Sequence, residues 1–117
     1  MSKNITTISP QRLHAMWHEG KNITLIDVRG PAEYRAGHVA GAKLIPLDDL
    51  TLDALAENEL FDDIEHACPV YLTCHAGLRA QQAAERLIEA GYHNVALLEG
   101  GTQAWQNAGL PIKRCGF

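Results

Sequence analysis

Short apolar segments of β-strand type alternate with helix-type segments along the whole 117-residue chain. The segment 23–29, ITLIDVR, is almost continuously apolar, which is typical of a strand covered on both faces. Strands that alternate with helices in so short a chain predict a parallel sheet with helices on both faces. We therefore expect an α/β fold in which residues 1–117 form a single domain. The strand-type segments are residues 6–8, 23–29, 42–47, 69–73 and 94–101, the last including a glycine turn.

Capping residues mark the first helix-type segment, residues 9–20. Ser9 stands at the N-cap position, Pro10 at the first helical position and Gly20 just beyond the end. Apolar side chains at helical spacing predict a buried stripe made of Leu13, Met16 and Trp17. Shorter helical segments are expected at residues 31–37 and within residues 49–67.

The most regular helix pattern begins near Arg79 and ends at Gly91, which stands where a C-terminal cap belongs. A last short helix is predicted to begin with Thr102 as its N-cap and to end at Gly109. The inward-facing positions are predicted to be Ala80, Ala83, Ala84, Leu87 and Ile88 in the first of these helices, and Ala104, Trp105 and Ala108 in the second.

The charge balance argues against a polyanionic partner. Ten basic and fourteen acidic residues give a net charge of −4, which disfavours nucleic acid or an anionic membrane surface as the main partner. The N-terminus has no apolar signal region, and no apolar run approaches the length needed to cross a bilayer. We therefore expect a cytoplasmic protein without a membrane segment, in which a local site for a small anion is still compatible with the net charge.

Three cysteines, Cys68, Cys74 and Cys115, argue against a disulfide framework in a reducing compartment. They form no CxxC pair and no zinc-type spacing, so no metal site is predicted from them. His14 and His18 lie four residues apart on the first predicted helix, but no HExxH glutamate and no third ligand accompany them. We expect two solvent-facing histidines rather than a metal site. A role for Cys115 as a second thiol that acts together with Cys74 is the minority interpretation, and an incidental cysteine is favoured.

The segment CHAGLR, from Cys74 to Arg79, follows the fourth predicted strand directly and leads into a helix. In a parallel sheet the chemistry gathers at the carboxyl ends of the strands. A turn from strand to helix leaves several backbone N–H groups unpaired, and Gly77 permits the tight backbone that lets them converge on an anion. The positive end of the following helix points at the same spot. A cysteine there should be a thiolate and a nucleophile, whereas packing in the core is the alternative for a cysteine at a strand end.

Four other polar residues lie near the end of the second predicted strand. Asp27, Arg29 and Glu33 are interpreted mainly as structural ion-pairing or hydrogen-bonding groups, with acid–base catalysis as the lesser alternative. His38 is expected to hold its loop through a hydrogen bond.

His75, which directly follows Cys74, either faces the mouth of the site or points to solvent, and these alternatives are equally supported.

Three motifs in order resemble the rhodanese family of sulfurtransferases over nearly the whole chain. CHAGLR matches the family pattern C-x-x-G-x-R at Cys74, Gly77 and Arg79. LIDVRGPAEYRAGHVAGAKLIP resembles the first family signature at Asp27, Val28, Arg29, Glu33, Tyr34, Gly37, His38, Val39, Gly41, Ala42 and Pro46. LLEGGTQAWQNAGLPI resembles the C-terminal signature at Gly100, Gly101, Trp105, Gly109, Leu110 and Pro111.

The resemblance implies a three-layer fold around a five-stranded parallel sheet, and a sulfurtransferase of the thiosulfate type. Cys74 would be the catalytic nucleophile that carries a persulfide, taking sulfur from a donor such as thiosulfate and passing it to cyanide or a thiol. The substrate would be bound by the rest of the loop, His75, Ala76, Gly77, Leu78 and Arg79. The partners implied are a small sulfur donor, a thiophilic acceptor and, in one version, a sulfur-accepting protein. No metal or organic cofactor is implied.

Three alternatives accompany this hypothesis. In the first, the chain acts as a protein-to-protein persulfide carrier or docking module with little turnover on small donors. The second is a non-catalytic rhodanese-like domain, which the presence of Cys74 disfavours. The third is a phosphatase. Related cysteine-dependent phosphatases place five residues between cysteine and arginine, whereas four stand between Cys74 and Arg79. A shorter loop suits a single sulfur and crowds a tetrahedral phosphate, so phosphatase activity is disfavoured.

Overall fold

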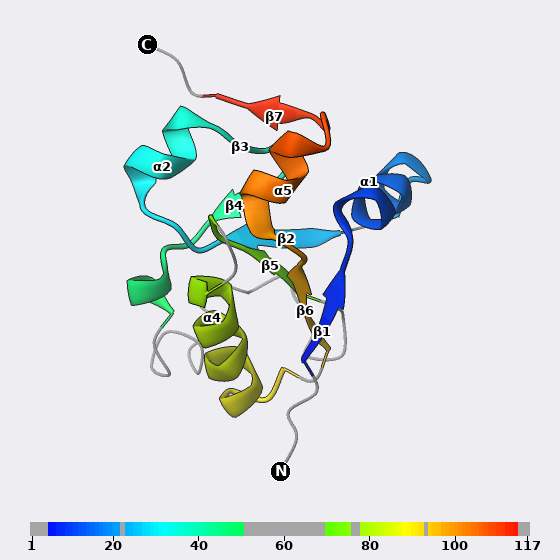
Figure 1. Cartoon of the computed structure of the whole chain (residues 1–117). Helices are drawn as coiled ribbons and strands as arrows, with labels where there is room; N and C mark the ends of the chain where they lie inside the picture. The colour runs from blue at the N-terminus through cyan, green and yellow to red at the C-terminus, as the bar shows by residue number, and fades with distance from the viewer. Residues whose placement is uncertain (1–4, 22, 51–69, 76–77, 93, 115–117) are drawn as a thin grey trace.

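Five parallel strands form the central sheet of the protein, in the order β1-β6-β5-β2-β4 (Figure 1). The computed structural model describes residues 5–21, 23–50, 70–75, 78–92 and 94–114. The expected α/β fold with a five-stranded parallel sheet is confirmed. The strands are β1 (Ile5–Ile8), β2 (Thr24–Asp27), β4 (Lys43–Leu44), β5 (Val70–Thr73) and β6 (Val95–Leu98).

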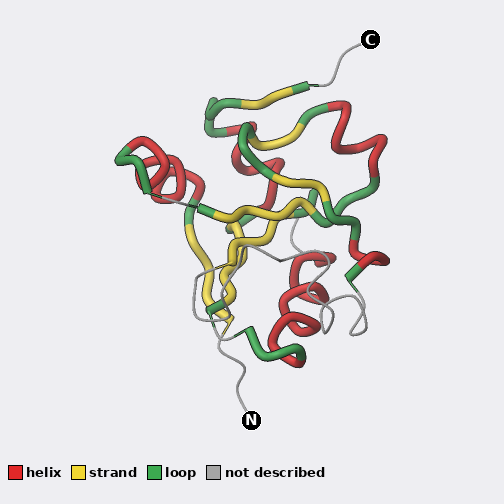
Figure 2. Tube along the Cα trace, turned by 180° about the vertical axis from the view of Figure 1, so that it is seen from behind, coloured by secondary structure: helices red, strands yellow, loops and turns green. Residues whose placement is uncertain are grey.

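Helices cover both faces of this sheet, as the alternation of segments predicts. Helix α4 (Leu78–Glu89) packs on one face, and α1 (Pro10–His18) and α5 (Gly101–Asn107) pack on the other (Figures 1 and 2). A second, two-stranded antiparallel sheet joins β3 (His38–Val39) to β7 (Ile112–Lys113) near α5. The remaining described elements are α2 (Pro31–Ala36) and the short 3-10 helix η1 (Leu47–Asp49).

The alternation of side chains along each strand supplies two separate hydrophobic cores. Val70 and Leu72 of β5 belong to the core beneath α4, whereas Tyr71 between them packs against the core on the α1 and α5 side. Leu25 and Ile26 of β2 are divided in the same way. Because successive side chains of a strand point to opposite faces, a strand covered by helices on both sides must be apolar throughout.

The predicted ends and faces of the helices are largely confirmed. Ser9 caps α1, since its hydroxyl accepts a hydrogen bond from the backbone N–H of Arg12 at 3.2 Å. Gly20 and Gly91 have positive φ angles beyond the ends of α1 and α4. The stripe of α4 is buried at Ala80, Ala83, Ala84 and Leu87, with Ile88 partly buried beside them. Leu13 is fully buried in α1, whereas Met16 and Trp17 are half-buried against the same core.

Three expectations need correction. Thr102 is not the N-cap of α5, because Gly100 occupies that position and Thr102 lies inside the first turn. Ala108 is exposed rather than inward-facing, because α5 ends at Asn107 and Ala108 is the C-cap residue beyond it. The strand predicted over residues 42–47 has only two residues, Lys43 and Leu44, in the sheet ladder. The helices expected within residues 49–67 lie mostly outside the described residues.

No described helix has both the length and the apolar character that crossing a bilayer requires.

A buried ion pair ties the end of β2 to the end of α2. The guanidinium of Arg29 donates to both carboxylate oxygens of Asp27, with the shortest contact at 2.8 Å, and its Nη2 also donates to the carbonyl of Gly37 at 2.7 Å. Asp27 is fully buried, and Arg29 is 5% exposed. These charges are stable in the interior because each satisfies the other, so removal of one leaves a charge without a partner.

We predict that Asp27→Asn lowers the free energy of unfolding by about 3–5 kcal/mol, because it leaves the Arg29 guanidinium buried and uncompensated. Urea denaturation followed by circular dichroism measures this change. The matched control is Asp49→Asn, the same chemical change at an exposed position of η1, which should alter stability by less than about 0.5 kcal/mol. Equal effects of the two substitutions would contradict the structural role assigned to the pair.

Candidate active site around Cys74

Cys74 lies immediately after β5, at the carboxyl edge of the sheet. Its side chain is buried, with 2% of the residue exposed. The backbone N–H of Ala80, in the first turn of α4, donates a hydrogen bond to Cys74 Sγ at 3.4 Å. A twelve-residue helix has a positive end at its N-terminus, and this donor belongs to that end. The sulfur therefore has a hydrogen-bond donor from the backbone of the first turn of α4.

The backbone that follows Cys74 is held by the start of α5. The N–H of Thr102 donates to the carbonyl of Cys74 at 2.7 Å, and the N–H of Gln103 donates to the carbonyl of His75 at 3.3 Å. Gly101 makes this approach feasible, because a Cβ atom there would lie 2.5 Å from the Cys74 oxygen and 2.7 Å from the His75 oxygen. Helix N-terminal N–H groups need acceptors, and the loop carbonyls supply them.

Two threonine hydroxyls add a second connection between β5 and α5. Thr73 Oγ1 and Thr102 Oγ1 lie 3.0 Å apart within hydrogen-bonding distance, and both residues are buried. Thr73 Oγ1 also donates to the carbonyl of Cys74 at 3.3 Å. Sequence reasoning interpreted Thr102 as a cap and did not identify Thr73. The sequence feature that could have identified Thr73 is its hydroxyl side chain at the last position of the strand, directly before Cys74.

Arg79 faces a carboxylate rather than standing alone. Its two terminal nitrogens donate to the two oxygens of Glu33, each at 2.9 Å, which joins α4 to α2. The hydrogen bond with Arg79 lowers the pKa of Glu33 to about 2, against a smaller opposing effect of partial burial. The pKa of Arg79 is raised in turn, mainly by the hydrogen bond with Glu33, against a smaller opposing effect of partial burial. Arg79 therefore joins α4 to α2, and its charge is balanced by Glu33.

The other polar candidates have structural partners. Arg29 pairs with Asp27, and Glu33 accepts from the backbone N–H of Gly30 at 3.2 Å in addition to Arg79. His38 is 3% exposed, and its Nδ1 lies 2.7 Å from the carbonyl of Tyr34. The expected ion-pairing and hydrogen-bonding roles of these residues are confirmed.

The structure brings together only part of the predicted loop. Cys74, the start of α4 at Leu78, and Arg79 meet at the carboxyl edge of the sheet, while His75 is exposed to solvent. Ala76 and Gly77 lie outside the described residues, as do Cys68 and Cys115. Across the described part of the chain, no group of three or more His, Cys, Asp or Glu side chains is arranged to hold a metal ion.

The chain is similar to known proteins over most of its length. The family model described as Rhodanese-like domain matches residues 9–108. A curated relative, "Thiosulfate sulfurtransferase GlpE" from Actinobacillus pleuropneumoniae serotype 5b (strain L20), is 30% identical over 115 residues, covering 97% of each chain. A solved rhodanese-like domain protein from Staphylococcus aureus is 30% identical, covers 92% of this chain and 98% of its own, and superimposes with a TM-score of 0.69.

A structure of thiosulfate sulfurtransferase from Pseudomonas aeruginosa has a TM-score of 0.80 at 23% identity, covering 96% of this chain and 21% of that chain. At this level of identity the similarity concerns the fold. Together with the relatives above, it agrees with the family resemblance of the three sequence motifs.

We predict that Gly101→Ala destabilises the protein by more than about 2 kcal/mol, because the methyl group meets two backbone oxygens that cannot move independently. Gly109→Ala is the matched control. Gly109 also has a positive φ, of +76°, but nothing lies within 4 Å of an added Cβ, so only the conformational cost of about 1 kcal/mol remains. Urea denaturation of both variants measures the difference. Equal losses would show that the close approach at Gly101 carries no cost of its own.

A second prediction concerns the pH dependence of the pair formed by Glu33 and Arg79. A carboxylate whose pKa is lower in the folded state stabilises the protein above its unfolded pKa, and that contribution disappears as the pH falls through the folded pKa. For Glu33 the window runs from 4.5 down to about 2. Because the pair is partly exposed, Glu33→Gln should lower the free energy of unfolding at pH 7 by about 1 kcal/mol or less.

The difference between wild type and Glu33→Gln should shrink as the pH is lowered through this window, which urea titrations at successive pH values will measure. Glu85→Gln serves as the control, because Glu85 also lies on α4 but its carboxylate accepts a hydrogen bond from Gln81 at 3.5 Å, whereas Arg79 pairs with Glu33. A wild-type advantage that stays constant to pH 2 would be inconsistent with an ionised Glu33 as its source.

Proposed function

The chain belongs to the rhodanese-like domain family, and from this we propose that it is a sulfurtransferase that carries sulfane sulfur as a persulfide on Cys74. The observation that supports this proposal most directly is the position of Cys74 Sγ. It lies at the carboxyl edge of a parallel sheet, 3.4 Å from a backbone N–H at the positive end of α4.

The proposed reaction has two displacement steps. In the first, the Cys74 thiolate attacks the outer sulfur of thiosulfate, the sulfur–sulfur bond of the donor breaks, and sulfite leaves with the bonding electrons. Cys74 then holds a negatively charged persulfide. In the second step, a thiophile such as cyanide or a thiolate attacks the outer sulfur of the persulfide, which releases thiocyanate or a new persulfide and regenerates the Cys74 thiolate.

Both forms of the enzyme in this scheme carry a negative charge on sulfur, so the site needs hydrogen-bond donors more than a proton shuttle. The N–H of Ala80 is one such donor, a fixed backbone group that requires no reorganisation during the reaction. Arg79 has its charge balanced by Glu33 and contributes by holding α4 in place. We propose that the remaining loop residues, His75, Ala76, Gly77 and Leu78, bind the donor around the sulfur.

The small size of a sulfur donor agrees with a buried nucleophile. With 2% of Cys74 exposed, the sulfur has little room for a bulky substrate at its surface. The curated relative from Actinobacillus pleuropneumoniae is named for thiosulfate, which is a small anion of this class. Thiosulfate is therefore the donor with which the proposal is tested.

We predict that the purified chain converts thiosulfate and cyanide to thiocyanate and that Cys74→Ser reduces this activity to the uncatalysed background, because a serine hydroxyl cannot form a persulfide. Thiocyanate is measured by its coloured iron complex. Cys68→Ser provides the same chemical change at another cysteine and should retain the activity.

Mass spectrometry after exposure to thiosulfate alone completes the test. The intact protein should gain one sulfur atom in the wild type and in Cys68→Ser but not in Cys74→Ser. A stable gain of sulfur on Cys74 without turnover would favour the carrier function over the enzyme. Activity that survives in Cys74→Ser would remove Cys74 from the proposed role.

A further inference from the structure

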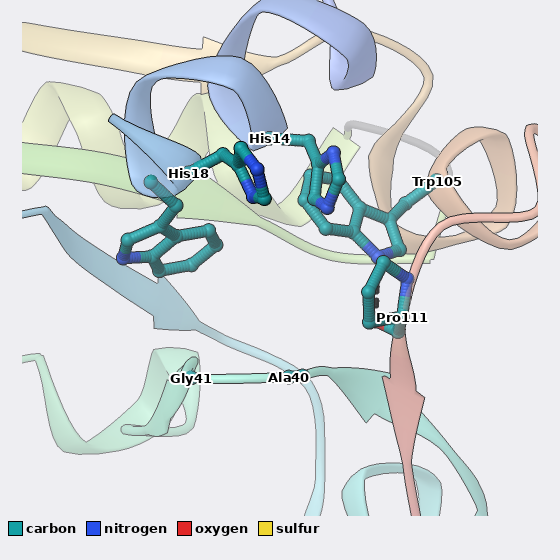
Figure 3. A pocket seen from close by; sticks show the side chains of 7 residues that line it. His14, His18, Ala40, Gly41, Trp105 and Pro111 are labelled. Carbon is teal, nitrogen blue, oxygen red and sulfur yellow. Dashed lines mark hydrogen bonds between the residues drawn. The ribbon is translucent and has the colours of Figure 1, made fainter. Parts of the chain in front are cut away.

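A cavity of about 330 Å³ lies on the α1 and α5 side of the sheet (Figure 3). Cys74 lies elsewhere, in the core beneath α4. No lysine, arginine, aspartate or glutamate is among its lining residues. The lining is His14, Trp17, His18, Ala40, Gly41, Trp105 and Pro111. The sulfur chemistry proposed above makes no use of this cavity or of its histidines.

We propose that His14 and His18 together bind one divalent transition-metal ion of the class that prefers imidazole ligands, such as Ni²⁺, Cu²⁺ or Zn²⁺. Residues four apart on a helix lie on the same face, one turn apart. The two imidazole rings are 6.2 Å apart between centroids and are tilted by 31°. Figure 3 shows both side chains projecting from α1 beside the cavity. Neutral imidazole is a good ligand for these ions.

The separation of the rings fits shared coordination after a small side-chain rotation. With metal–nitrogen bonds of about 2.0–2.1 Å, two imidazoles that share one ion have ring centroids on the order of 5–6 Å apart. The observed 6.2 Å is slightly longer than that range, so the two rings must approach by side-chain rotation to share one ion. The four-residue spacing of His14 and His18 on α1 therefore places two ligands where a single ion can bind both.

Packing around His14 restricts its ring before any ion arrives. The ring of His14 contacts Trp105 edge-on, with centroids 5.8 Å apart and planes at 78°. Trp105 is itself buried, and its indole N–H donates to the carbonyl of Pro111 at 2.7 Å. A ligand whose conformation is already restricted loses less entropy on binding. His18 is exposed and can rotate toward His14.

The cavity beside His14 and His18 leaves space for the other ligands of the ion. Within the described residues no third histidine, cysteine, aspartate or glutamate joins the pair, so the protein supplies two ligands. Water or a small exogenous donor would occupy the other positions, and the cavity has room for several such molecules. An open coordination sphere distinguishes this site from a closed structural zinc site with four protein ligands.

The two tryptophans of the chain, Trp17 and Trp105, both line the cavity and therefore report on the site. The experiment titrates the untagged 117-residue chain with Ni²⁺ and follows quenching of tryptophan fluorescence. We expect saturable quenching with one ion per chain, reversed by EDTA. His14→Gln and His18→Gln should each weaken the apparent affinity on the order of 100-fold, because the second coordination bond is then no longer intramolecular.

A control variant tests whether the spacing of the two histidines matters for metal binding, or only their number. We call it the spacing control. The double variant His18→Gln/Glu19→His keeps the number of histidines but places the second one five residues from His14, away from the shared face. Its affinity should stay as weak as that of His18→Gln. His18 is exposed, so its glutamine variant should fold normally, which circular dichroism checks.

Electron paramagnetic resonance with Cu²⁺ provides a signature that a structural role would not produce. Coupling to two equivalent nitrogens is expected in the wild type and coupling to one nitrogen in His18→Gln. Binding by the cysteine thiols would appear equally in wild type and variants. Unchanged quenching in both single variants, or full affinity in the spacing control, would overturn the proposal.

Discussion

The hydrogen bond from the N–H of Thr102 to the carbonyl of Cys74 is the contact on which the arrangement of the site depends. It joins the end of β5 to the start of α5, two elements that are distant in the sequence. The contact requires a residue without a side chain at position 101, because any Cβ would meet the oxygens of Cys74 and His75. The other end of α5 is held by buried Trp105, so the position of the loop backbone depends on the hydrophobic core.

This connection determines where the sulfur atom can lie. With its carbonyl bound to α5 and the hydroxyl of Thr73 donating to the same oxygen, the backbone of Cys74 has little freedom to rotate. The side chain then projects into the core beneath α4, where the N–H of Ala80 meets the sulfur. Helix α5 thus holds the backbone of Cys74, and helix α4 donates a hydrogen bond to its sulfur.

The charged side chains around the site are largely paired with one another. Asp27 with Arg29 and Glu33 with Arg79 form two ion pairs near the carboxyl edge of the sheet, and both involve bonds to two oxygens of the carboxylate. Paired charges hold elements together but have little attraction left for a substrate. A backbone N–H at a helix N-terminus is then the appropriate donor for a thiolate or persulfide. The histidines on the other side of the sheet belong to a different environment, in which two tryptophans and no charged side chain line the cavity.

The sequence by itself determined the fold class, the ends of the main helices and the candidate nucleophile, because these depend on local periodicity, on capping residues and on the order of short motifs. Strand β2 was recognisable since a strand covered on both faces must be apolar throughout. The partners of polar residues were decided only by tertiary structure. Thr102 looked like a cap, but its amide and hydroxyl bind residues of β5 and the following loop. Glu33 and Arg79, far apart in the chain, meet only because α2 and α4 converge at one edge of the sheet.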